Sequence, residues 1–228
     1  MRTCEVSKRP TKIMKIPLLG YLAVFSALIP IVIGLRNFRI LKRDAIMVLL
    51  YLSISAGFSI LQLVMAKMGH NNLWIGHLTR MLDTCVMLCL FGYWSTTYYF
   101  RRILQWMAFG FFFFWSIMMS NMEPFVQESL IVAPISRLIL CIGSLIFLHE
   151  LNQNSNKSIL KDWRFWVASS NLIYSSSSVL LDALRRPIAQ FPTNKMFLAF
   201  KLVWLLFIFS QAILAYAFIC YGHEGEKE

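Results

Sequence analysis

Long apolar segments, each about the length needed to cross a membrane, recur along this chain of 228 residues. The hydrocarbon core of a bilayer takes about 20 apolar residues in helical form. Lipid cannot bond to free backbone groups, so continuous apolar segments of this length must be helices. The sequence therefore predicts an all-α fold, an integral membrane bundle of seven transmembrane helices. These segments span roughly 16–35, 45–66, 73–98, 103–121, 130–149, 164–183 and 196–220.

The composition supports a membrane protein and argues against other classes. Hydrophobic residues make up 58% of the chain and charged residues 14%, whereas soluble proteins are about 45–50% apolar and about 25% charged. The net charge of +11 would suit a nucleic-acid partner, but the basic residues lie between the apolar segments, as in membrane-protein loops. We therefore expect a lipid bilayer around the chain and no nucleic-acid partner. The five cysteines show no metal-ligand spacing and are expected to be free thiols.

The chain divides into a long transmembrane domain and two short polar ends. We expect an N-terminal extension or a mis-called start at 1–13, the seven-helix domain at 14–222 and a short polar tail at 223–228. The loops on one side of the membrane contain nine Lys and Arg residues, and those on the other side contain four. Because the basic side faces the cytoplasm, we predict a multi-pass protein of the cell inner membrane with the N-terminus outside and the C-terminus cytoplasmic.

Five ionisable residues lie within the apolar segments or at their margins, although a charge at the bilayer centre costs at least about 2.5 kcal/mol. Odd-numbered segments start on the same face, and the sixth ends there. All five residues therefore belong to one half of the bilayer, the outer half in this orientation. Such residues usually pair with one another or face the bundle interior. They are Arg80, Asp83, Arg137, Asp182 and Lys201.

Two segments place polar residues three or four positions apart, which puts them on one helix face. In the third segment we expect Arg80 and Asp83 to pair and His77 to lie at the rim of a pocket. With three basic residues against two acidic ones, we predict a net-positive pocket between the third, fifth, sixth and seventh helices that binds a small polar or anionic ligand. The structural alternative to a pocket is that the serines mediate close packing between helices. The pocket residues on these two segments are Trp74, His77, Arg80, Asp83, Asn171, Tyr174, Ser175, Ser178 and Asp182, joined by Arg137 and Lys201.

Motifs for catalysis or for a cofactor are weak. Three candidate metal ligands, His77, Asp83 and Asp182, are too dispersed for a zinc site, and His77 precedes Asp83 by about 9 Å along a helix. Neither a nucleophile elbow nor a phosphate-binding glycine loop is present. A retinal Schiff base on Lys201 is disfavoured, because this lysine lies near the start of its segment and Phe197 stands one turn before it. We predict no catalytic residue, no metal site and no cofactor.

Several short motifs are found in one group of membrane proteins. They are Asn71, Asn72, Leu73 and Trp74 with His77 and Asp83; Ser136 with Arg137; and Phe165 and Trp166 followed by Leu172, Ile173 and Tyr174. With them, the chain from about Met14 to Gly222 resembles an uncharacterised family of small bacterial seven-transmembrane-helix proteins of about this length. Relatives often have Glu where this chain has Leu140. The resemblance implies seven helices and singles out His77, Asp83 and Arg137, but it implies no activity.

The pocket leads us to expect a non-enzymatic sensor or accessory module that passes a signal to a partner protein. The alternative is a small solute or ion transporter that uses the same polar groups, and a membrane-embedded hydrolase comes third. A transporter needs a polar route through both halves of the membrane. After Thr84, the third segment has a long apolar gap before Ser95, which counts against transport.

Overall fold

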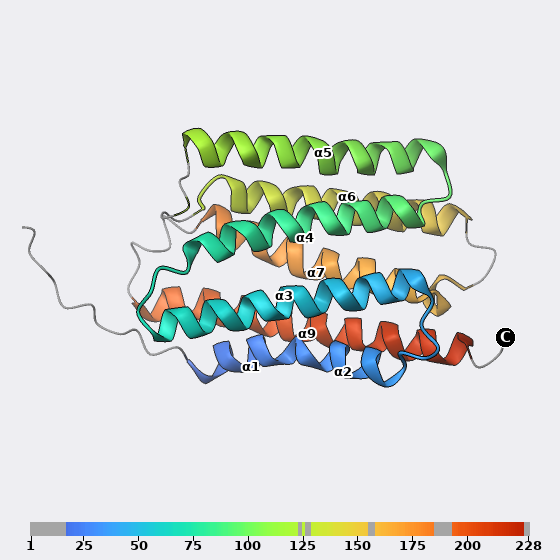
Figure 1. Ribbon diagram of the computed structural model, residues 1–228, viewed down its shortest axis with the longest axis horizontal. Helices are drawn as coiled ribbons and strands as arrows, with labels where there is room; N and C mark the ends of the chain where they lie inside the picture. Colours follow the sequence, from blue (N-terminus) through green and yellow to red (C-terminus); the bar gives the residue numbers. More distant parts are fainter. Residues whose placement is uncertain (1–16, 123–124, 126–128, 155–157, 185–192, 226–228) are drawn as a thin grey trace, which may run out of the picture.

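The computed structural model describes residues 17–122, 125, 129–154, 158–184 and 193–225, and for 193–197 and 223–225 it describes the helix alone. Residues 1–13, the predicted extension, lie outside these ranges. Figure 1 shows an elongated bundle in which helices run in opposite directions along one axis. The described residues contain helices and no strands. The predicted all-α membrane bundle is confirmed.

The helices follow the predicted segments in order but not in number, because the first predicted segment forms two helices, and the count of seven membrane spans stays a prediction. In chain order they are α1 (Leu18–Ser26), α2 (Leu28–Arg36), α3 (Arg43–Lys67), α4 (Leu73–Trp94), α5 (Tyr98–Asn121), α6 (Val132–Asn154), the short 3-10 helix η1 (Ile159–Lys161), α7 (Trp163–Ala183) and α9 (Thr193–Gly225). Six described stretches are long and apolar enough to cross a membrane: Leu18–Arg36, α3, α4, α5, α6 and Leu198–Gly222. α7 is not one of them, because its serines and Asn171 lower its hydropathy. α9 continues through 225, so the expected polar tail begins inside a helix.

The first predicted segment is two helices that meet at Ala27. Pro30 has no N–H to donate to the carbonyl of Ser26, and its ring crowds that carbonyl, so a regular helix cannot pass this point. The hydroxyl of Ser26 donates to the carbonyl of Ala23 at 2.6 Å, a bond that is common where helices bend. α1 and α2 nevertheless follow one another along the same side of the bundle (Figure 1) and together are long enough to cross a membrane.

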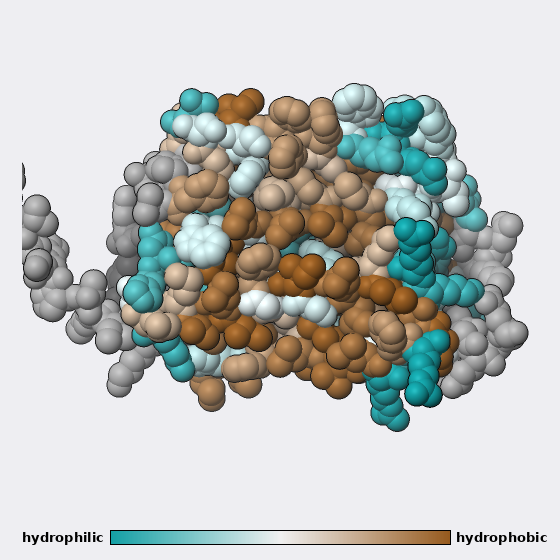
Figure 2. Space-filling view, viewed as in Figure 1, coloured by the Kyte–Doolittle hydropathy of each residue, from teal (hydrophilic) through white to brown (hydrophobic). Residues whose placement is uncertain are grey.

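The bundle has two ends, which we name for what lies inside them. The cavity end, at the left of Figure 1, is where α4, α6 and α9 begin and where α3 and α7 end. The aromatic end is the opposite one. Hydrophobic side chains cover most of the visible face between the ends, and hydrophilic ones gather toward the ends (Figure 2). The aromatic end contains most of the described basic residues: Arg36, Arg39, Lys42, Arg43, Arg101, Arg102, Lys161 and Arg164.

Five rings pack together inside the aromatic end, and we call them the aromatic cluster. The rings of Phe91 and Phe147 stack with centroids 5.1 Å apart, and Trp163 contacts both Trp94, at 5.1 Å, and Tyr221, at 5.2 Å. All five side chains are at least nine-tenths buried. Aromatic pairs at these distances add about 0.5–1.5 kcal/mol beyond the area that they bury. The cluster joins α4, α6, α7 and α9 into a tightly packed core.

A buried carboxylate fixes the turn between α4 and α5. Glu150 of α6 is 2% exposed and accepts hydrogen bonds from the Thr97 amide at 2.8 Å, the Thr96 hydroxyl at 3.2 Å and the Ser95 hydroxyl. Thr97 is the N-cap of α5, so the carboxylate satisfies an amide at the start of that helix. This turn explains why α4 ends at Trp94 and α5 begins at Tyr98, earlier than the segment boundaries expected from hydropathy.

Candidate functional site

A cavity of about 490 Å³ lies in the cavity end of the bundle. Helices α1, α3, α4, α7 and α9 supply its walls, and Arg137 reaches it from α6. In Figure 2, paler side chains show at the bottom of a recess near the centre of the face. Small-molecule sites in proteins have volumes of about 300–1,000 Å³. The cavity is therefore large enough for a metabolite-sized ligand.

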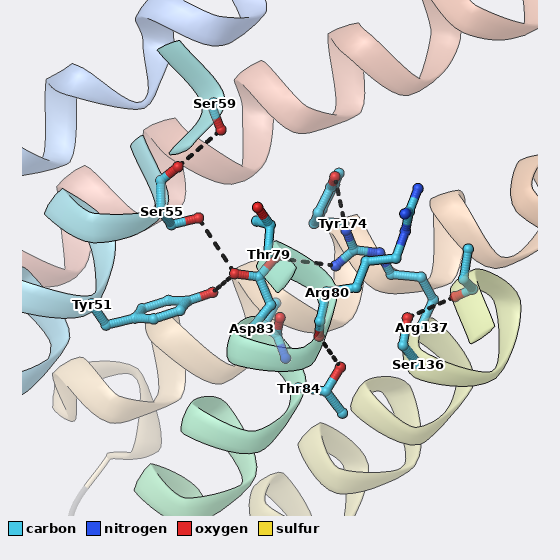
Figure 3. Close-up of polar contacts among 12 residues, drawn as sticks. Tyr51, Ser55, Ser59, Thr79, Arg80, Asp83, Thr84, Ser136, Arg137 and Tyr174 are labelled. Atoms are coloured by element: carbon cyan, nitrogen blue, oxygen red, sulfur yellow. Dashed lines mark hydrogen bonds and ion pairs between the residues drawn. The ribbon is translucent and has the colours of Figure 1, made fainter. Parts of the chain in front are cut away.

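An ion pair between Asp83 and Arg137 forms the floor of the cavity. Asp83 lies at mid-length of α4, and its Oδ2 is 3.9 Å from Nη1 of Arg137. The Tyr51 hydroxyl donates to Asp83 Oδ1 at 2.9 Å and the Ser55 hydroxyl at 3.3 Å. Arg137 Nη2 donates to the hydroxyl of Tyr174 at 3.3 Å, and the guanidinium lies 4.7 Å from the centre of the Tyr174 ring. Figure 3 shows these groups converging from α3, α4, α6 and α7.

These contacts compensate two charges that would otherwise be costly to bury. The side chains of Asp83 and Arg137 are only 11% and 10% exposed. A buried pair is stable only where further hydrogen bonds satisfy both groups, and here Asp83 has more of them than Arg137. Arg137 Nε has no hydrogen-bond partner among the described residues, and neither have Ser178 Oγ and Gln211 Oε1 on the cavity wall. Each unsatisfied buried atom costs about 1–3 kcal/mol.

Arg80 does not form the predicted pair with Asp83. The described ion pair of Asp83 is with Arg137, on another helix. Arg80 lines the cavity wall, and its guanidinium turns back along α4, away from Asp83 (Figure 3). A side chain on Gly76 would lie 3.3 Å from Arg80 Nη1, so the glycine leaves room for this orientation. The arginine thereby extends toward the cavity end, where charges are less costly than at mid-membrane.

The predicted polar stripe on the sixth segment divides between the cavity and the helix contacts. Asn171, Tyr174, Ser178 and Asp182 line the cavity, together with Arg80, Asp83 and Arg137. Ser175 is fully buried away from the cavity, and Asn171 Nδ2 also donates to Ser144 on α6 at 3.0 Å. The structural alternative, in which these residues mediate helix packing, therefore applies to part of the stripe.

Four predicted site residues lie off the cavity lining, namely Ser175, described above, and Trp74, His77 and Lys201. Trp74 is 37% exposed, and His77 is fully buried with its ring 5.9 Å from that of Phe125, so the prediction that His77 lies at the pocket rim is wrong. Lys201 is exposed on α9.

The described lining residues do not show the predicted net-positive charge of the pocket. Without Lys201, the described lining residues comprise two basic groups, Arg80 and Arg137, and two acidic ones, Asp83 and Asp182. The described part of the cavity lining is therefore balanced in charge.

Sequence reasoning missed the contribution of α3. Tyr51, Ser55, Ser59 and Gln62 line the cavity at offsets of four, four and three residues. The same spacing rule that singled out the third and sixth segments would have found this stripe. This stripe contains no charged residue, however, and the predicted pocket was built on the segments that contain charges.

Together these observations define an all-α integral membrane bundle with a cavity that is lined by polar and apolar residues and contains a buried ion pair. Comparison of the chain with family models, with curated proteins and with solved structures found no match. The resemblance to the bacterial seven-helix family stays a prediction. Within the described ranges, no three His, Cys, Asp or Glu side chains lie close enough together to hold a metal ion. The cavity itself is the basis for a functional proposal.

Proposed function

We propose that the protein binds a small polar ligand in the central cavity and acts as a sensor or accessory subunit of the bacterial inner membrane. The ion pair of Asp83 with Arg137 is the observation that carries this proposal. Ionisable residues kept at membrane depth are costly and usually serve a function. This pair lies at the floor of a metabolite-sized cavity, where the hydrogen-bonding groups of several helices converge.

The shape of the cavity favours a binding module over a transporter. The inner end of the cavity is lined by the apolar residues Val48, Met87 and Leu214 together with Ser170, Ser210 and Gln211. Beyond these residues the aromatic cluster fills the bundle. A transported solute would have to pass this packed core, whereas a sensed ligand needs access from one end only.

Charge distribution supports an orientation with the cavity end outside. The eight described basic residues of the aromatic end lie in loops and at helix ends, where a cytoplasmic location is expected. A signalling partner protein would then contact the aromatic end, and the ligand would come from the outer side.

Ligand screening on the purified protein in lipid nanodiscs tests the proposal. A ligand at about 100 times its Kd stabilises the folded state by about 2.7 kcal/mol and raises the melting temperature. We expect at least one member of a panel of polar metabolites to do so, and proteoliposomes to show no uptake of that compound. Failure of every compound would contradict a binding role, and uptake would favour the transporter.

Two serines on α7 provide a matched pair of variants. Ser178 lines the cavity, whereas Ser176 is exposed and donates to the carbonyl of Ile173 on its own helix. Ser178→Ala is expected to weaken binding of the identified ligand, and Ser176→Ala to leave it unchanged. Equal effects would place the binding site elsewhere.

A further inference from the structure

The two sides of the cavity differ in chemistry. α3 and α4 supply the polar groups of Tyr51, Ser55, Gln62, Thr79 and Asp83, interspersed with apolar residues. α9 and α1 supply mostly apolar side chains. α3 makes its main contacts with α1, α2 and α4, so the cavity separates its polar face from α7 and α9. A molecule that fills the cavity therefore meets hydrogen-bonding groups from α3, α4 and α7 and a mostly hydrophobic surface from α9 and α1.

Aromatic rings dominate the apolar side. Phe200, Trp204 and Phe207 follow one another on α9 at offsets of four and three residues, which places them on one face. The Phe200 and Trp204 rings are 6.2 Å apart, and the Phe207 ring lies 4.9 Å from that of Tyr174 on α7. Ala23 of α1 and Ala27, the residue between α1 and α2, complete this side. Aromatic surfaces favour an aromatic partner by about 0.5–1.5 kcal/mol per ring pair.

The charge balance limits the net charge of the occupant. Asp83 and Asp182 offset Arg80 and Arg137 among the described lining residues. An ion with a net charge would lose its hydration without gaining a surplus counter-charge, which is unfavourable in a buried site. An uncharged molecule avoids this cost, and a zwitterion can match each of its charges to one of the opposite sign.

Building on the proposed function, we infer that the ligand is a small aromatic molecule of zero net charge with a hydrogen-bonding edge. Its ring packs against Trp204 and Phe207, and its polar edge faces α3, α4 and the ion pair. The amides of Gln62 and Gln211, on opposite sides, provide donors and acceptors for such an edge.

Four probes built on one indole ring test this inference by direct titration of the protein in nanodiscs. Indole-3-acetamide is neutral, tryptophan is zwitterionic, indole-3-acetate is an anion and tryptamine is a cation. We expect binding of at least one of the first two, and binding at least about tenfold weaker for both ions. Tightest binding of either ion would overturn the inference, and so would binding of none of the four. In both cases a hit from the wider metabolite panel would leave the proposed function standing.

Two phenylalanines on α9 supply the matched variants. Phe207 lines the cavity, whereas Phe209, two residues further along, is 55% exposed on another face of the helix. Phe207→Ala is expected to weaken binding of the neutral or zwitterionic probe by about tenfold, and Phe209→Ala to leave it unchanged. Equal binding by the two variants would show that the ring does not pack against this wall and would overturn the inference.

Discussion

The two halves of the bundle use the same helices in different ways. In the cavity half, polar groups of α3, α4 and α7 surround a space of about 490 Å³, and the charged pair lies at its floor. In the aromatic half, α4 and α7 join α6 and α9 around five packed rings. Packed interiors resist change, whereas a hollow interior can accept a ligand. The aromatic half is tightly packed, and the cavity half has the open space that the proposed function requires.

Among the described residues, each half of the bundle buries one carboxylate, and the two carboxylates have different partners. Asp83 forms an ion pair with Arg137 and accepts hydrogen bonds from Tyr51 and Ser55. Glu150 accepts only from the backbone and hydroxyl groups of one turn, as far as the described residues show. The first arrangement ties three helices together beside a cavity, and the second fixes a single turn. Substitutions in each half test this division.

The largest effect is expected from breaking the ion pair. Arg137→Leu leaves Asp83 buried without its counter-charge and is expected to cost about 3–5 kcal/mol of unfolding free energy. Replacing Asp83 by Leu in the same chain should recover most of this loss, because no buried charge remains unpaired. Unfolding in mixed micelles measures both variants, with the exposed Lys201→Leu as a control that should leave stability unchanged. A double variant as unstable as the single one would contradict the pairing.

In the aromatic half, Glu150→Leu removes the acceptor for the α4–α5 turn. Hydrogen bonds to a charged group contribute about 1.5–3 kcal/mol each, so we expect a loss of about this size and fraying at the start of α5. Glu150→Gln keeps an acceptor oxygen and should lose less. Hydrogen exchange at Thr97 and Tyr98 measures the fraying. Neither variant should change ligand binding, and a loss of binding without unfolding would contradict the separation of the halves.

Gly143 tests how tightly the helices pack where the aromatic half begins. A Cβ at this position would lie 2.4 Å from Leu88 Cδ2, so Gly143→Ala forces Leu88 to shift. Overpacking of this kind costs about 1–3 kcal/mol. A lower melting temperature with unchanged binding is the expected result. An unaltered melting temperature would show that Leu88 has room to move.

The smallest effect is expected at Gly57 of α3, which borders open space. No atom lies within 4 Å of a Cβ built there. Gly57→Ala should therefore stabilise α3 by roughly 0.5–1 kcal/mol through its better helix propensity. A rise in the melting temperature checks this expectation, and a fall comparable to that of Gly143→Ala would mean that this face of α3 is packed.

The sequence allowed prediction of much of the site but not of its pairing. Spacing placed Arg80, Asp83, Ser178 and Asp182 on faces that line the cavity. Helix periodicity specifies which residues share a face, but not how a helix is rotated against its neighbours. The pair of Asp83 with Arg137 instead of Arg80, and the burial of His77 beside Phe125, depend on that rotation.

The sequence by itself determined that this chain forms an all-α membrane bundle, because segments of about 20 apolar residues have no other stable form in lipid. It also determined which helices contain charges. Only the tertiary structure decided that α3 contributes polar residues to the cavity, that Lys201 lies outside the lining and that the charges of the described lining residues balance. These features arise from contacts between helices far apart in the chain, where packing, rather than local periodicity, selects which side chains meet.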